Sequence, residues 1–107
     1  MKLDILAFGA HPDDVEMGCG GTIAKSTSAG KKVGIVDLTR GELGTNGTVE
    51  IRDKEASEAS KILGVSFRTN LEFEDGFIFN NKESQIRVVE IIRQYKPDII
   101  LSNTQID

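Results

Sequence analysis

The sequence predicts an α/β fold in which a mainly parallel sheet is covered by helices on both faces. Short apolar runs alternate with amphipathic segments along the 107 residues, and strands that alternate with helices build parallel βαβ units. The first apolar run, residues 3–8, ends abruptly in a cluster of ionisable side chains. In folds of this class ligands bind beyond the carboxyl ends of the strands, so this cluster is the predicted position of a site.

The first strand and the first helix are expected within the first 30 residues. Residues 3–8 form the strand, and residues 22–28 form a helix that Gly30 ends. Between them, Cys19 is expected to be a small buried residue. Three glycines in the same stretch are expected to allow close packing of helix and strand: Gly18, Gly20 and Gly21.

The middle of the chain predicts a second strand and a second helix. Residues 33–39, VGIVDLT, are β-branched and apolar, which is typical of a buried strand. A polar, glycine-rich loop follows, and Thr48 is a suitable N-cap for a helix over 49–63 that Gly64 ends. The apolar positions predicted to face inward are Ile51, Ala56, Ala59, Ile62 and Leu63.

The last third of the sequence predicts two more strands around a helix. Part of 65–73 is expected to be a strand, and residues 84–95 a helix that Pro97 prevents from continuing. Residues 98–102 form the fourth strand. The helix has an i, i+3, i+4, i+7 apolar pattern made by Val88, Ile91, Ile92 and Tyr95. Two turns are expected before it, at Asp75–Gly76 and at Asn80–Asn81.

Because no covering helix follows the fourth strand, residues 1–107 are expected to be the N-terminal portion of a single domain, truncated after that strand. The uncovered face of the sheet favours association, so a homo-oligomer is expected.

Composition excludes several classes of partner. The net charge is −4 and basic residues are scattered, which argues against a nucleic-acid or anionic membrane surface. One cysteine rules out an internal disulfide and suits a reducing compartment. The N-terminal apolar stretch is short and contains Asp4, unlike a signal peptide or a membrane span. We therefore expect a cytoplasmic protein.

A dinucleotide site is the first alternative for glycines after a strand. Its fingerprint, G-x-G-x-x-G, places the pyrophosphate at the helix N-terminus. Here the residues after the strand are G-A-H-P-D-D, whose two carboxylates would repel a phosphate. Nucleotide binding is therefore not predicted.

The ionisable cluster suggests a metal site. His11 and Asp14 make an H-x-x-D pair on a turn that Pro12 stiffens, and a neutral imidazole and a carboxylate are both zinc ligands. Asp13 could act as a general base beside the metal, or it could be a helix-capping or turn aspartate. Glu16 could support the ligands or simply be an acid near a helix start. Spacing alone leaves a hydrogen-bonded structural histidine as the alternative.

The run AHPDDVE at 10–16 resembles the signature of the LmbE/PIG-L family of zinc-dependent deacetylases. GCGGTIAK, TRGELGTNGT and the helix over 51–64 resemble its bacillithiol-biosynthesis branch, which acts on N-acetylglucosaminyl malate. The resemblance implies a Rossmann-like three-layer α/β/α fold and an amino-sugar substrate. It also implies roles for individual residues: zinc held by His11 and Asp14, Asp13 as general base, Arg52 in the substrate pocket, and Glu42 and Asn46 at its rim.

The sequence departs from the family pattern in its metal ligands. The family's third zinc ligand lies in an H-x-x-H-type motif after the fourth strand, whereas His11 is the only histidine in this sequence. The third ligand is therefore expected beyond Asp107. The alternative is a truncated α/β module that is catalytically incompetent.

Overall fold

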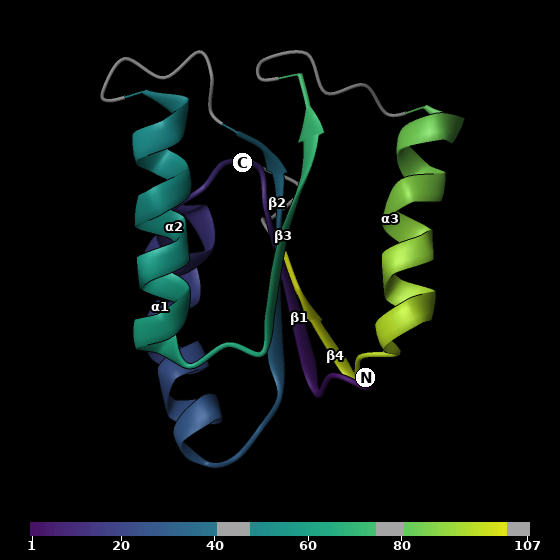
Figure 1. Ribbon diagram of the computed structural model, residues 1–107. Helices are drawn as coiled ribbons and strands as arrows, with labels where there is room; N and C mark the ends of the chain where they lie inside the picture. Colours follow the sequence, from purple (N-terminus) through teal and green to yellow (C-terminus); the bar gives the residue numbers. More distant parts are fainter. Residues whose placement is uncertain (41–47, 75–80, 103–107) are drawn as a thin grey trace.

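A four-stranded parallel sheet forms the middle of three layers (Figure 1). This computed structural model describes residues 1–40, 48–74 and 81–102. The strands are β1 (Ile5–Gly9), β2 (Val33–Thr39), β3 (Phe67–Phe73) and β4 (Ile99–Leu101), and their order across the sheet is β3-β2-β1-β4. All three neighbouring pairs are parallel. The predicted three-layer α/β/α class is confirmed.

The strand order creates a switch point beside β1. From β1 the chain moves outward to β2 and then to β3, and it returns to the opposite side of β1 as β4. The direction in which successive strands are added therefore reverses at the boundary between β1 and β4. The crevice at such a point is where open α/β sheets bind ligands.

Three helices cover the sheet. α1 (Asp14–Ser28) and α2 (Val49–Leu63) lie on one face, and α3 (Lys82–Tyr95) lies on the other (Figure 1). Within the part of the chain that the structure describes, none of the helices has the length and apolar character needed to cross a membrane.

α1 begins earlier than predicted. It starts at Asp14 rather than at residue 22 and includes a kink at Cys19, whose φ of −144° is not helical. Val15 and Ile23 are buried against the sheet, and this packing outweighs the poor helix propensity of the glycines. The packing role predicted for those glycines is wrong, because a Cβ at any of them would have no neighbour within 4 Å: Gly18, Gly20 and Gly21.

α2 has the predicted ends but a different inner face. The Thr48 hydroxyl accepts a hydrogen bond from the Ile51 amide at 3.2 Å, and Gly64 closes the helix with a φ of 73°. However, Ile51 is 49% exposed and Ile62 86% exposed, so the prediction that they face inward is wrong. Leu63 packs against the core as predicted, and the Ser60 hydroxyl, which was not predicted to face inward, accepts a hydrogen bond from Arg68 of β3.

The remaining elements follow the prediction closely. β2 has the expected bounds, and β3 lies inside the expected segment. α3 begins two residues early with the Asn81 side chain as its N-cap, and Lys96 closes it in a left-handed conformation. Its predicted apolar face packs against the sheet. The turn expected at Asp75–Gly76 lies outside the described residues.

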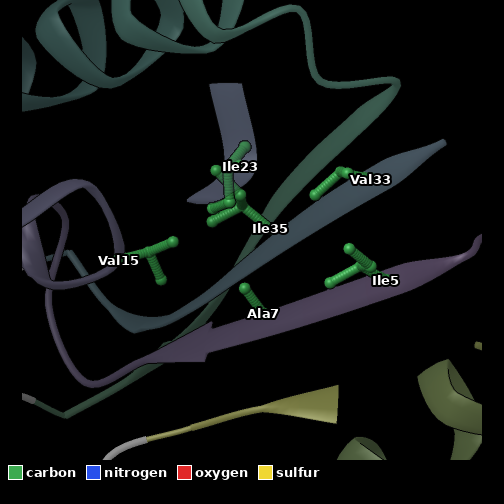
Figure 2. Close-up of a cluster of buried hydrophobic side chains, with 6 residues drawn as sticks. All are labelled: Ile5, Ala7, Val15, Ile23, Val33 and Ile35. Atoms are coloured by element: carbon green, nitrogen blue, oxygen red, sulfur yellow. The ribbon is translucent and has the colours of Figure 1, made fainter. Parts of the chain in front are cut away.

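Two hydrophobic clusters hold the layers together. The first lies between the sheet and α1, and Figure 2 shows Val15 and Ile23 directed toward the strands. The second lies beneath α3. Burying a valine, leucine or isoleucine side chain contributes about 1.5–3 kcal/mol to the stability of the fold. The buried members are Ile5, Ala7, Val15, Ile23, Val33 and Ile35 in the first cluster, and Leu3, Leu6, Val36 and Leu71 in the second.

Candidate active site at the carboxyl end of β1

The turn between β1 and α1 brings the predicted metal ligands together. The His11 amide donates to Asp14 Oδ2 at 3.0 Å, and the Asp14 amide donates back to the His11 carbonyl at 3.2 Å. The imidazole Nδ1 lies 3.4 Å from the same carboxylate oxygen. Pro12 is buried between them. The H-x-x-D pair is therefore a compact, hydrogen-bonded unit at the switch point of the sheet.

Gly9 allows this turn to form so close to the sheet. A Cβ on Gly9 would lie 3.0 Å from Val15 Cγ2 and 3.1 Å from Asp14 Cβ. Thr39, at the end of β2, holds Ala10, the residue before His11, because its amide and hydroxyl both donate to the Ala10 carbonyl at 3.0 and 2.9 Å. The ends of two strands thus fix the backbone from which the ligands project.

Asp13 has an unusual backbone conformation. Its φ of 93° and ψ of −28° place a non-glycine residue in the left-handed region, which costs free energy and is often seen at functional sites. It occupies the N-cap position of α1, yet its side chain makes no capping hydrogen bond. The alternative of a side-chain helix cap is therefore wrong, and the exposed carboxylate is available to a ligand.

The donor set fits part of a zinc site. An imidazole and a carboxylate on one turn can supply two of the three protein ligands that a catalytic zinc needs. Over residues 1–40, 48–74 and 81–102, no group of three or more histidine, cysteine, aspartate or glutamate side chains is placed to hold a metal. Any third ligand therefore has to come from outside the described residues.

A buried ionic network lies beside the turn and was not predicted from the sequence. Arg68 of β3 forms a bidentate pair with Asp37 of β2, with Nε–Oδ2 and Nη2–Oδ1 distances of 2.8 and 3.0 Å. Arg68 Nη2 also lies 3.1 Å from Glu16 Oε1, in the first turn of α1. The signal available in the sequence was a charged residue, Asp37, inside the apolar run of the second strand.

Burial and pairing act in opposite directions on this network. Burial raises the pKa of the Asp37 carboxyl, and the hydrogen bonds and charge of Arg68 only partly offset the rise. Burial disfavours the Arg68 cation, but its bonds to Asp37 and Glu16 together outweigh this and raise its pKa. Arg68 therefore stays charged and donates hydrogen bonds to both carboxyl groups.

A pocket of about 390 Å³ extends from the turn along α2. At its mouth, Arg40 pairs with Asp53 and lies 3.8 Å from Glu72. Arg52 lies in the first turn of α2 and is not among the residues that line this pocket, and its place in a substrate pocket stays a prediction. The pocket is lined by Pro12, Asp37, Arg40, Asp53, Ala56, Ser57, Ser60, Arg68, Thr69, Asn70 and Glu72.

Two predicted pocket residues, Glu42 and Asn46, lie outside the described part of the chain.

Comparison with known proteins identifies the family. The sequence pattern of the PIG-L family, described as GlcNAc-PI de-N-acetylase, matches residues 6–107. The chain belongs to the PIG-L family.

Individual PIG-L relatives agree with this assignment. The diacetylchitobiose deacetylase of Thermococcus kodakarensis is 35% identical over 104 residues, covering 91% of this chain and 39% of the relative. An uncharacterized deacetylase of Escherichia coli, YaiS, is 44% identical over 71 residues, 66% of this chain and 38% of the relative. The crystal structure of the conserved protein TT1542 from Thermus thermophilus superposes with a TM-score of 0.87 at 47% identity, over 92% of this chain and 44% of that one.

The chain thus spans less than half the length of these PIG-L relatives. The expected membership of the LmbE/PIG-L family is confirmed. The three relatives do not single out its bacillithiol branch, which remains a prediction.

Proposed function

We propose that this chain is part of a zinc-dependent deacetylase that hydrolyses the N-acetyl group of an N-acetylglucosamine derivative. The observation that carries the proposal is the His11–Asp14 pair at the switch point, with the strained Asp13 between its members. The PIG-L match and the diacetylchitobiose deacetylase relative support the substrate class.

In this proposal His11 and Asp14 hold the metal, with a third ligand expected beyond Asp107. When bound, zinc supplies a Lewis acid that polarises a carbonyl and lowers the pKa of a coordinated water toward about 7. Asp13 accepts the proton of the attacking water and returns it to the leaving amine as the C–N bond breaks. Acetate and a free amino sugar are the products.

The finer substrate rests on the sequence motifs. We propose N-acetylglucosaminyl malate, the bacillithiol precursor, because the motifs at 39–48 and 51–64 resemble that branch. Arg52 would bind the malate carboxylates as a fixed positive charge. Glu42 and Asn46 would contact the sugar at the rim of its pocket.

The proposal extends to the state of the working protein, which would be a cytoplasmic homo-oligomer. Ile99 and Ile100 of the edge strand β4 are 53% and 47% exposed, which supports burial of this edge by further protein. Size-exclusion chromatography with light scattering tests the oligomer, and a monomer at all concentrations would refute it.

The test of the chemistry separates metal binding from proton transfer. His11→Ala and Asp14→Ala should lose zinc, because each removes one of three ligands. Asp13→Asn should keep zinc and lose about 10²–10⁴-fold in kcat, the usual loss of general acid–base help. Zinc content and acetate release are measured for each, with Asp98→Asn as a surface control 65% exposed at its side chain. Unchanged zinc content in both ligand variants would refute the metal site.

An incompetent module is the second candidate, because the described residues hold only two of the three expected ligands. Residues 1–107 should then release no acetate with excess zinc, whereas a version continuing into an H-x-x-H-type segment should. Comparable turnover by the short chain would exclude this candidate.

A further inference from the structure

We propose that Arg68 is a positioning residue that, through Glu16, holds the turn carrying His11 and Asp14 in its ligand-binding geometry. The inference rests on the proposed function for the use of that geometry. The positioning itself can be measured without metal or substrate.

The Arg68 guanidinium of β3 connects three neighbouring elements: β2, α2 and, through Glu16, α1. Its planar fork pairs with Asp37 on β2 through two hydrogen bonds of 2.8 and 3.0 Å. Nη1 donates to α2, at 3.3 Å to Ser60 Oγ and 3.4 Å to the Ala56 carbonyl. The side chain is only 10% exposed, so water cannot readily replace these partners. The guanidinium is therefore fixed to the sheet and to α2.

Glu16 links the fixed Arg68 guanidinium to the turn that carries His11 and Asp14. Its Oε1 accepts from Arg68 Nη2 at 3.1 Å, and its side chain is 18% exposed. Glu16 lies in the first turn of α1, two residues after Asp14, so its backbone directly follows the turn that carries the ligands. Anchoring Glu16 therefore restrains the position of Asp14 relative to the sheet.

The turn needs such a restraint. Asp13 has a positive φ of 93°, a conformation that persists only where the surroundings over-determine it. Gly9 and Thr39 fix the turn on its strand side, while the link from Arg68 to Glu16 fixes its helix side. An acid that only complements the helix dipole would need neither a buried partner nor a low exposure.

Amide hydrogen exchange in the metal-free full chain tests the link directly. Three amides report on the turn: His11, which bonds Asp14 Oδ2, Asp14, which bonds the His11 carbonyl, and Met17, which bonds the Asp13 carbonyl. Glu16→Ala should raise their exchange rates about tenfold or more, as loss of a charge-assisted hydrogen bond predicts. Glu16→Gln keeps an oxygen acceptor for Arg68 and should stay close to the parent.

Two further variants isolate the cause. Glu83→Ala removes an acid from the first turn of α3 and should leave the three amides unchanged, which controls for the loss of a carboxylate elsewhere in the fold. Arg68→Met should raise the exchange of the three amides by at least as much as Glu16→Ala, because it removes the partner of Glu16 and also that of Asp37. The proposal would be overturned if the three amides exchanged at the parental rate in Glu16→Ala. It would also be overturned if Glu16→Gln raised their exchange rates as much as Glu16→Ala does.

Zinc affinity, measured by competition with a chelating dye, gives a second readout. Residues that orient metal ligands typically change affinity by about 10–100-fold, and Glu16→Ala should fall in this range. The parent for this measurement is the version that continues past Asp107 into an H-x-x-H-type segment. If that parent binds no zinc, the proposed function fails while the exchange result still decides the positioning role. If the parent binds zinc and Glu16→Ala binds it equally well, the positioning role fails alone.

Discussion

Replacement of Arg68 by methionine should strongly destabilise the fold. Asp37 is 2% exposed, and Arg68 supplies both of its charged hydrogen bonds. Removing one member of a buried ion pair leaves an uncompensated charge and costs about 3–5 kcal/mol. Small domains have a total unfolding free energy of about 5–15 kcal/mol, so the loss is a large fraction of the whole.

The cost should depend on pH in a defined direction. Burial already raises the pKa of Asp37, and without Arg68 the opposing hydrogen bonds and charge disappear, so its pKa should rise further. A carboxyl whose folded pKa lies above its unfolded value of about 3.9 stabilises the fold when protonated. That stability is complete below the unfolded pKa and is lost as the pH rises through the folded one. The deficit of the variant should therefore be largest at neutral pH and shrink toward about pH 4.

Urea denaturation followed by circular dichroism measures this effect, with a second substitution as the control. Asp37→Asn in the Arg68→Met background removes the charge but keeps the shape. A buried uncharged group without a partner costs about 1–3 kcal/mol, so the double variant should recover about 2 kcal/mol at neutral pH. A loss below about 1 kcal/mol in Arg68→Met, with no rescue by Asp37→Asn, would refute the description of Asp37 as a buried charge that depends on Arg68.

Four other outcomes follow from particular contacts. Gly34→Ala should destabilise by about 1–3 kcal/mol in urea denaturation, because its Cβ would lie 2.6 Å from a Leu3 methyl carbon, whereas Gly18→Ala, with no neighbour within 4 Å, should be neutral or stabilising. Thr48→Ala removes the N-cap of α2 and should cost about 1 kcal/mol in the same assay. Burial raises the pKa of the Cys19 thiol, so its alkylation at pH 8 should be slower than that of a free thiol, and equal rates would contradict the burial. Arg52→Ala should raise KM about ten- to a hundredfold for a carboxylate-bearing substrate but not for plain N-acetylglucosamine, and equal losses on both would assign it another role.

Local sequence signals determined most of the secondary structure. The apolar periodicity of 84–95 predicted both α3 and its inner face, and the caps at Thr48 and Gly64 predicted the ends of α2. These features depend on neighbours in the chain, within one or two turns, so they can be recognised without the fold. The position of the candidate site was predicted for a similar reason. An abrupt change from a buried strand to ionisable residues marks the carboxyl end of a strand.

Tertiary packing decided what local patterns could not. Because glycines have a low helix propensity, α1 was predicted to begin at residue 22, eight residues too late. Burial of Val15 and Ile23 makes the segment helical from Asp14. Ile51 and Ile62 match a helical apolar face but are exposed, whereas the Ala56 carbonyl and the Ser60 hydroxyl of the same helix accept hydrogen bonds from Arg68. A residue's propensity is a weak preference that long-range contacts can outweigh.

The sequence by itself determined the fold class, the order of the strands and helices along the chain, and the turn that carries His11, Asp13 and Asp14. Only the tertiary structure decided which distant residues support that turn. Arg68 lies 52 positions from Glu16 and 31 from Asp37 in sequence, and the parallel pairing of β2 with β3 brings the two strands together. No local pattern specifies a contact of that separation, because its energy exists only after the sheet has formed and water has been excluded from the pair.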